Sequence, residues 1–88
     1  MRSANVMVVN RLGLHARAAV KLVQAANRFK SHITVSTEEI CADAKSILGV
    51  LTLAAGQGTE LVIETNGPDE EDAVEEIKTL VVGGFGEE

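Results

Sequence analysis

The feature that most restricts the fold of this chain is a change of hydrophobic period near residue 16. Residues Ala4 to Asn10 are rich in β-branched side chains, which is typical of a strand. From Ala16 to Phe29 apolar residues instead recur at spacings of three and four, the pattern of an amphipathic helix. The apolar stripe is formed by Ala19, Leu22, Val23, Ala26 and Phe29. Asn10 through Gly13 supply turn residues between the two patterns. A strand followed by a tight turn and a helix is therefore predicted for the first third of the chain.

The remaining elements follow from shorter patterns. The segment His32 to Thr37 alternates like a strand, Glu38-Glu39 marks a turn, and Ile40 to Asp43 forms a short edge strand. Ser46 is a favourable N-cap for a brief helix through about Leu53, which Gly56 and Gly58 are expected to terminate.

The last third of the chain predicts one more strand and one more helix. Glu60 to Thr65 reads as a strand, and Asn66-Gly67-Pro68 breaks it. The segment Asp69 to Val82 reads as a helix whose first turn holds four acidic residues, explained as favourable charge at a helix start. Gly83-Gly84 ends the helix, and Phe85 is expected to fold back onto it.

The resulting order is β-α-β-β-α-β-α, which favours an α+β fold with helices on one face of an antiparallel sheet. Ferredoxin-like chains have a similar order, so the order alone does not determine the sheet topology. Copper chaperones of that fold need a paired-cysteine loop, whereas this chain has only Cys41. That count also excludes an internal disulfide.

Composition limits the functional classes. The 88 residues suit one domain, 1–88, and only two residues are aromatic, so the core must be aliphatic. A net charge of −5 without a basic run argues against nucleic-acid binding. No apolar run approaches the ~20 residues of a membrane span, and no signal segment is present, which predicts a cytoplasmic protein.

The junction Arg11-Leu12-Gly13-Leu14-His15-Ala16-Arg17 carries the candidate chemistry. It would place an imidazole and a guanidinium beside the first amides of a helix, which lack intrahelical partners and attract anions. Imidazole is a nucleophile near neutral pH, and arginine holds phosphoryl groups well. A phosphorylatable His15 is one interpretation, and an ordinary solvated turn histidine is the other.

Several motifs resemble one family. The segments Gly13–Ala19 and Ala44–Val50 resemble the Gly-Leu-His-Ala-Arg-Pro-Ala signature and the regulatory motif of HPr, the histidine-containing phosphocarrier of the bacterial phosphoenolpyruvate-dependent phosphotransferase system. Ala54–Glu60 resembles the turn into its fourth strand, and Gly84–Glu87 resembles its tail.

The resemblance implies an open-faced β-sandwich, with three helices over one face of a four-stranded antiparallel sheet in the order 1-4-2-3. It implies a stoichiometric carrier rather than an enzyme. The system's first enzyme, charged by phosphoenolpyruvate, would phosphorylate His15 on Nδ1, and a histidine of a sugar-specific or regulatory acceptor would then receive the phosphoryl group. Arg17 and the amides of Ala16, Arg17 and Ala18 would hold that group.

The same resemblance suggests a docking surface and a regulatory site. The expected partner contacts are Leu12, Ala16, Val20, Lys21, Gln24, Ile47, Leu48 and Leu51. Ser46 would be the target of a serine kinase and phosphorylase, although an N-cap needs no further purpose. The carrier is expected to be a monomer without a cofactor or a metal.

The chain departs from the family pattern at three places. Ala18 replaces the signature proline and restores a backbone N–H, so the phosphoryl site could gain a donor. Glu38-Glu39 replaces a glycine-containing hairpin turn. Gln24 and Asn27 occupy positions that are basic in many relatives, which would weaken attraction to the first enzyme.

Three alternatives remain open at this point. The first is a regulatory binding module controlled by Ser46, although such relatives are expected to lack the histidine. The second is a nitrogen- or metabolism-regulating branch without sugar transport, which depends on the acceptors of the cell. The third is a metal site at His15, which has no second ligand nearby in the sequence.

Overall fold

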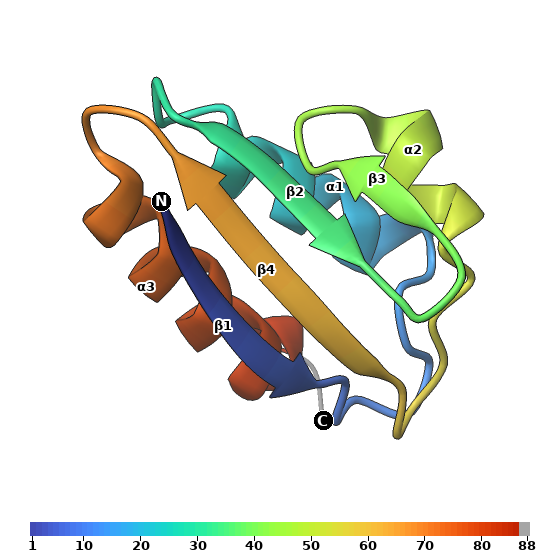
Figure 1. Cartoon of the computed structure of the whole chain (residues 1–88). Coiled ribbons are helices and arrows are strands. Elements are labelled where there is room, and N and C mark those ends of the chain that lie inside the picture. The colour runs from blue at the N-terminus through green and yellow to red at the C-terminus, as the bar shows by residue number, and fades with distance from the viewer. Residues whose placement is uncertain (87–88) are drawn as a thin grey trace.

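The computed structural model describes residues 1–86, and its four strands form one antiparallel sheet in the order β1-β4-β2-β3 (Figure 1). The strands are β1 (Arg2–Met7), β2 (His32–Ser36), β3 (Cys41–Asp43) and β4 (Glu60–Asn66). The helices are α1 (Ala16–Ala26), α2 (Ile47–Thr52) and α3 (Glu70–Val82), followed by a 3₁₀ turn, η1 (Gly84–Gly86). Glu87 of the predicted tail motif lies outside the described residues.

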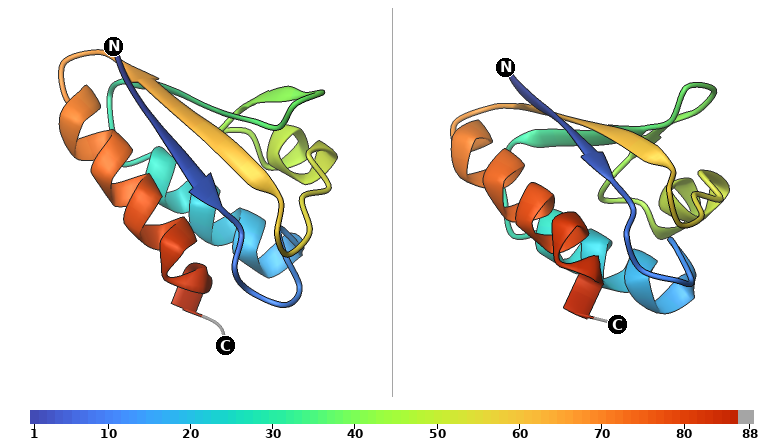
Figure 2. Two further views of the ribbon diagram at one scale, coloured as in Figure 1. Left: turned by 60° about the horizontal axis from the view of Figure 1, so that its bottom comes forward. Right: turned by 90° about the horizontal axis from the view of Figure 1, so that it is seen from below.

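All three helices cover the same face of the sheet and leave the other face open (Figure 2). The two longer helices, α1 and α3, run side by side beneath the sheet, and α2 lies near β3 (Figures 1 and 2). The predicted open-faced sandwich and its strand order 1-4-2-3 are thereby confirmed.

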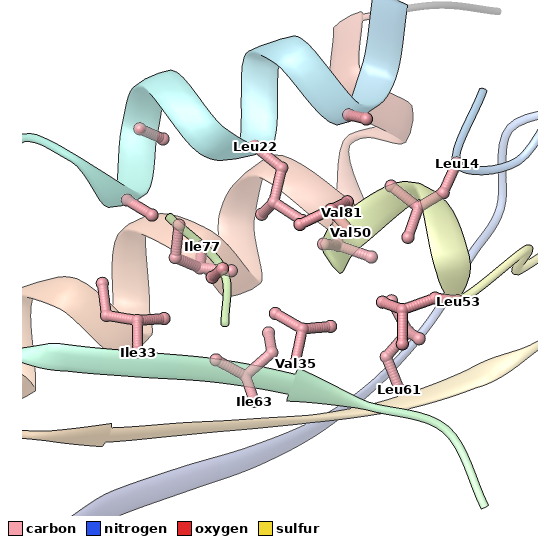
Figure 3. Packing of buried hydrophobic residues seen from close by; sticks show 14 of the residues in the cluster. Leu14, Leu22, Ile33, Val35, Val50, Leu53, Leu61, Ile63, Ile77 and Val81 are labelled. Atoms are coloured by element: carbon pink, nitrogen blue, oxygen red, sulfur yellow. The ribbon is translucent and has the colours of Figure 1, made fainter. Parts of the chain in front are cut away.

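The core lies between the sheet and the helices (Figure 3). Leu22 of α1 and Ile77 of α3 are fully buried against the inward-facing side chains of the central strands. Those side chains are Ile33 and Val35 of β2 and Leu61 and Ile63 of β4. The core is almost entirely aliphatic, as the composition requires.

The first strand is shorter than predicted at its C-terminal end. It stops at Met7 rather than Asn10, although Val8 and Asn10 are buried. The N–H of Val8 donates to Thr59 O, and Val8 O accepts from Gly58 N–H. The chain therefore leaves the strand while it is still hydrogen-bonded to the turn before β4.

Two helix ends also differ from the prediction. Helix α1 ends at Ala26, and residues up to Phe29 continue as turns, with the ammonium group of Lys45 donating to Phe29 O. Helix α2 is followed by Leu53 and by Ala54, whose φ of 49° lies in the left-handed region. The expected termination by Gly56 and Gly58 is wrong, because the chain already reverses at an alanine.

The β2–β3 turn does not need a glycine. Thr37 Oγ1 accepts hydrogen bonds from the N–H groups of Glu39 and Ile40, and Thr37 N–H donates to Ile40 O. These bonds close the turn around Glu38-Glu39. They also leave Ile40 in the turn, so β3 begins one residue later than predicted.

The acidic start of α3 has a function beyond the helix dipole. Asp69 makes no side-chain cap to its own helix. Its carboxylate instead accepts from the N–H groups of Lys30 and Ser31, each at 2.9 Å, and from the Ser31 hydroxyl. Glu70 accepts from Gly67 N–H at 3.0 Å. The explanation of this run by helix-start charge alone is incomplete, because Asp69 joins α3 to the α1–β2 loop.

This bridge predicts a pH-dependent stability difference. The Ser31 hydroxyl, followed by the Lys30 N–H, lowers the pKa of Asp69 from 3.8 to about 2. The stabilisation is fully present above pH 3.8 and is lost as the pH falls through about 2. We expect Asp69→Asn to unfold at lower urea concentration than the parent at pH 7, with the difference vanishing toward pH 2. Urea unfolding curves across this range measure it, and a difference that stays constant with pH would contradict the bridge.

Candidate functional site

A four-residue turn over residues 10–13 lies between β1 and the candidate histidine. Gly13 N–H donates to Asn10 O at 3.2 Å, and Gly13 adopts a φ of +66°. A Cβ at this position would lie 2.3 Å from Ala55 O, so only glycine fits. Leu14 is buried, and its N–H donates to Ala55 O at 2.8 Å. The α2–β4 connection thus fixes the backbone immediately before His15.

His15 is the N-cap of α1. Its backbone is extended, its ring is half-buried, and its Nδ1 accepts from the N–H of Arg17 at 3.3 Å. An N–H donor requires a lone pair on the acceptor, so Nδ1 is unprotonated in this arrangement. Nδ1 therefore points at the amide end of the helix.

The groups around His15 suit an anion. The first-turn amides of Ala16 and Ala18 have no acceptor among residues 1–86. The Arg17 side chain is exposed and forms no hydrogen bond or ion pair with any residue in the described part of the chain. Because the helix dipole also favours negative charge here, the site can receive a phosphoryl group.

Ala18 contributes differently from its two neighbours. Its side chain is fully buried in the core, whereas Ala16 and Arg17 are exposed. Only its backbone N–H is therefore available to the candidate site.

Exposed apolar side chains lie in the turn before His15 and on α1 and α2, two helices that pack against each other. Leu12 and Leu48 are the most exposed of them, at 70% and 74%. Val20 of α1 and Ile47 and Leu51 of α2 are exposed as well. We call these five residues the apolar surface. Gln24 is exposed on α1 nearby along the chain.

Lys21 differs from the other predicted contact residues. Its ammonium group donates to Phe85 O at 2.6 Å, and its side chain is half-buried. The structure therefore gives Lys21 an intramolecular role, fastening η1 to α1. The sequence offered no signal for this bond between distant segments.

Ser46 is the N-cap of α2, as predicted. Its Oγ accepts from Gly49 N–H at 3.2 Å, and the residue is half-buried. Ile47, the first residue of α2, belongs to the apolar surface. A modification of Ser46 would therefore adjoin that surface.

Asn10 has a part in the site that the sequence did not predict. The sequence places it at the end of the strand and at the start of the turn, and its backbone carbonyl does close that turn by accepting from Gly13 N–H. In addition, its side chain is buried and its Nδ2 donates to Gly13 O at 2.9 Å.

Within residues 1–86 no group of three or more histidine, cysteine or acidic side chains is arranged to hold a metal ion. No helix among the described residues combines the length and apolar character needed to cross a membrane.

Comparison with known proteins agrees with this geometry. The family profile "PTS HPr component phosphorylation site" matches residues 2–82. The phosphocarrier protein HPr of Cupriavidus necator is 45% identical over 87 residues, covering 99% of this chain and 98% of that protein.

Solved structures extend the comparison to the fold. HPr-C-His from Thermoanaerobacter tengcongensis superposes with a TM-score of 0.95 at 38% identity, covering 100% of this chain and 99% of the other. An HPr dimer from that organism gives a TM-score of 0.79 at 37% identity, covering 99% and 100%. With its fold, its motifs and nearly its whole length in agreement, the chain belongs to the HPr family of the phosphotransferase system and is a phosphocarrier protein rather than a catalyst.

Proposed function

We propose that this carrier accepts a phosphoryl group on Nδ1 of His15 from the phosphorylated first enzyme of the phosphotransferase system. It then donates the group to a histidine of a sugar-specific or regulatory acceptor. The observation that carries the proposal is the hydrogen bond from Arg17 N–H to His15 Nδ1 at the start of α1. Because Nδ1 accepts this hydrogen bond, Nδ1 carries a lone pair. It is also the ring nitrogen that faces the anion-binding groups.

The chemistry follows from these groups. The Nδ1 lone pair attacks phosphorus, the bond to the donor nitrogen breaks, and its electron pair stays on the donor imidazole. Once Nδ1 is bonded to phosphorus, it no longer accepts from the Arg17 N–H, which then faces a phosphoryl oxygen. The Arg17 guanidinium supplies positive charge. A neutral imidazole is a good leaving group, so the reverse sequence of bond changes delivers the phosphoryl group to the acceptor.

The apolar surface supports the partner assignment. Its side chains lie on α1, on α2 and in the turn before His15, so a protein docked there would meet the ring. We assign Leu12, Ala16, Val20, Gln24, Ile47, Leu48 and Leu51 to this contact. Lys21 contributes through the helix it fastens rather than as a free cation.

The alanine at position 18 gives a specific prediction. Ala18→Pro removes an amide that has no acceptor among residues 1–86, so the helix should tolerate it. If that amide holds the phosphoryl group, the variant's phosphohistidine should hydrolyse roughly threefold to tenfold faster, the equivalent of one hydrogen bond. Decay of the phosphorylated mass at neutral pH measures the lifetime. An unchanged or longer lifetime in Ala18→Pro would exclude the amide as a ligand.

Ser46 is assigned a regulatory role within the same proposal. A phosphate at this N-cap is electrostatically tolerated and adds negative charge beside the apolar surface. It would therefore oppose docking of an acidic partner. Ser46→Asp should raise the KM for the first enzyme more than Ser46→Asn, which caps the helix without the charge.

We further propose that residues 1–88 act as one HPr-like domain, as a monomer in the cytoplasm. The related HPr dimer makes association of two copies the alternative. Light scattering after size-exclusion chromatography distinguishes a monomer of 9.3 kDa from a dimer.

The direct test is incubation with phosphoenolpyruvate and a first enzyme, followed by intact-mass measurement. We expect one acid-labile phosphate that His15→Ala abolishes. A phosphate that survives acid and is lost in Ser46→Ala would instead support the regulatory module. Transfer from the labelled carrier to candidate acceptors then distinguishes a sugar-transport branch from a regulatory one.

A further inference from the structure

Asn10 is a buried polar residue at the base of the turn that presents His15. Its side chain is 1% exposed, and Nδ2 donates to Gly13 O at 2.9 Å. Its own carbonyl accepts from Gly13 N–H at 3.2 Å. One residue therefore closes the turn twice, through its backbone and through its side chain.

The turn is confined on two further sides. Ala55 O accepts from Leu14 N–H and lies where a Gly13 Cβ would be. On the other side, the position of a Cβ on Gly84 lies 3.6 Å from Asn10 Cβ, so η1 packs against Asn10. Asn10 thus connects the C-terminal turn to the backbone two residues before His15.

We propose that Asn10 is a positioning residue for phosphoryl transfer at His15, an inference that rests on the proposed function. By holding the Gly13 carbonyl, Asn10 fixes the direction in which the chain enters α1. That direction sets the place of His15 Nδ1 relative to the Arg17 N–H. Small displacements of a reacting group lower the rate of transfer without changing how the partner binds.

The test compares two buried polar residues, Asn10 beyond the end of β1 and Thr65 near the end of β4. Asn10→Leu keeps a similar side-chain volume and removes the donor. The matched control is Thr65→Val, because Thr65 is also 1% exposed and its Oγ1 donates to a backbone carbonyl, that of Glu70, at 2.8 Å. Each variant removes a buried side-chain hydrogen bond seen within residues 1–86. Thr65, however, lies on the strand leading into the start of α3, far along the chain from His15.

Steady-state phosphorylation by the first enzyme, with this carrier as its substrate, separates positioning from stability. For Asn10→Leu we expect kcat to fall about tenfold, with KM unchanged within about twofold, because the apolar surface is intact. For Thr65→Val we expect parental kinetics despite a lowered urea midpoint. The Arg17 amide resonance should shift in Asn10→Leu and stay in place in Thr65→Val, since that amide reports the bond to Nδ1.

Each outcome decides one question. If Asn10→Leu does not fold, Asn10→Ala removes the same donor without adding apolar bulk. Parental kcat in a folded Asn10 variant, or an equal loss in Thr65→Val, would overturn the positioning role. Failure of the unmodified carrier to accept any phosphate would instead refute the proposed function itself.

Discussion

Replacing Arg17 by alanine should slow phosphoryl transfer to His15 by about 100-fold, the usual effect of removing one preorganised charge-stabilising group. The Arg17 side chain has no partner within residues 1–86, so its charge is available to the phosphoryl group. Helix α1 should persist, because the Arg17 N–H that caps onto His15 is a backbone group. Rapid-quench single-turnover transfer from the phosphorylated first enzyme measures the change.

Arg28→Ala is the matched control for charge. Arg28 lies just past the C-terminal end of the same helix and is exposed. Its guanidinium pairs with the carboxylate of Glu76. Its loss changes the net charge equally, but we expect nearly parental transfer. Arg17→Lys should recover part of the rate, because lysine keeps the charge without the planar fork. Equal losses in Arg17→Ala and Arg28→Ala would mean that only long-range attraction to the partner is involved.

Replacing Phe85 by alanine should lower the free energy of unfolding by about 3 to 5 kcal/mol, the range for removing a buried aromatic ring. Phe85 is only 1% exposed, and its carbonyl oxygen accepts a hydrogen bond from the Lys21 ammonium group. The substitution leaves a cavity where η1 packs against the core. Urea unfolding followed by circular dichroism measures the loss.

Val82→Ala provides the control from the same segment. Val82 is 56% exposed at the end of α3, so its truncation should change stability by less than about 0.5 kcal/mol. A loss in Phe85→Ala as small as that of Val82→Ala would show that the C-terminal turn detaches from the core in solution.

Much of the fold could be predicted because hydrophobic period is a local signal. The stripe through Leu22 and Ala26 identified the buried face of α1, and both residues are fully buried. Alternation around Ile33 and Val35 identified the inward face of β2 in the same way. The strand order came from the family resemblance, because period alone does not specify which strands pair.

The differences arise where distant segments compete with local signals. Asp69 was assigned to the helix start, but residues 38 and 39 positions away take its carboxylate. Lys21 was predicted only as a partner contact, and the sequence did not indicate that its ammonium group donates to a carbonyl 64 positions away. Ala54 adopts a left-handed backbone that alanine alone does not indicate. None of these features produces a hydrophobic period that could be recognised in the sequence.

The sequence pointed to the residues of the candidate site, but it did not predict how they are arranged. The motif pointed to His15, Arg17 and the start of a helix, and all three meet at the N-terminus of α1. It did not indicate that His15 is itself the N-cap, or that the Arg17 N–H binds its Nδ1. The sequence marked Asn10 as a turn residue, but it did not indicate that the Asn10 side chain donates to Gly13 O.

Long-range ¹H–¹⁵N NMR of the His15 ring, before and after phosphorylation by the first enzyme, tests the central claim most directly. Before transfer, Nδ1 should have the shift of an unprotonated, hydrogen-bonded nitrogen and Nε2 that of an N–H. Afterwards, Nδ1 should couple to phosphorus. The Arg17 amide proton resonance should move downfield, because this amide would then donate to a phosphoryl oxygen. Coupling of phosphorus to Nε2, or a phosphate on another residue, would contradict the account.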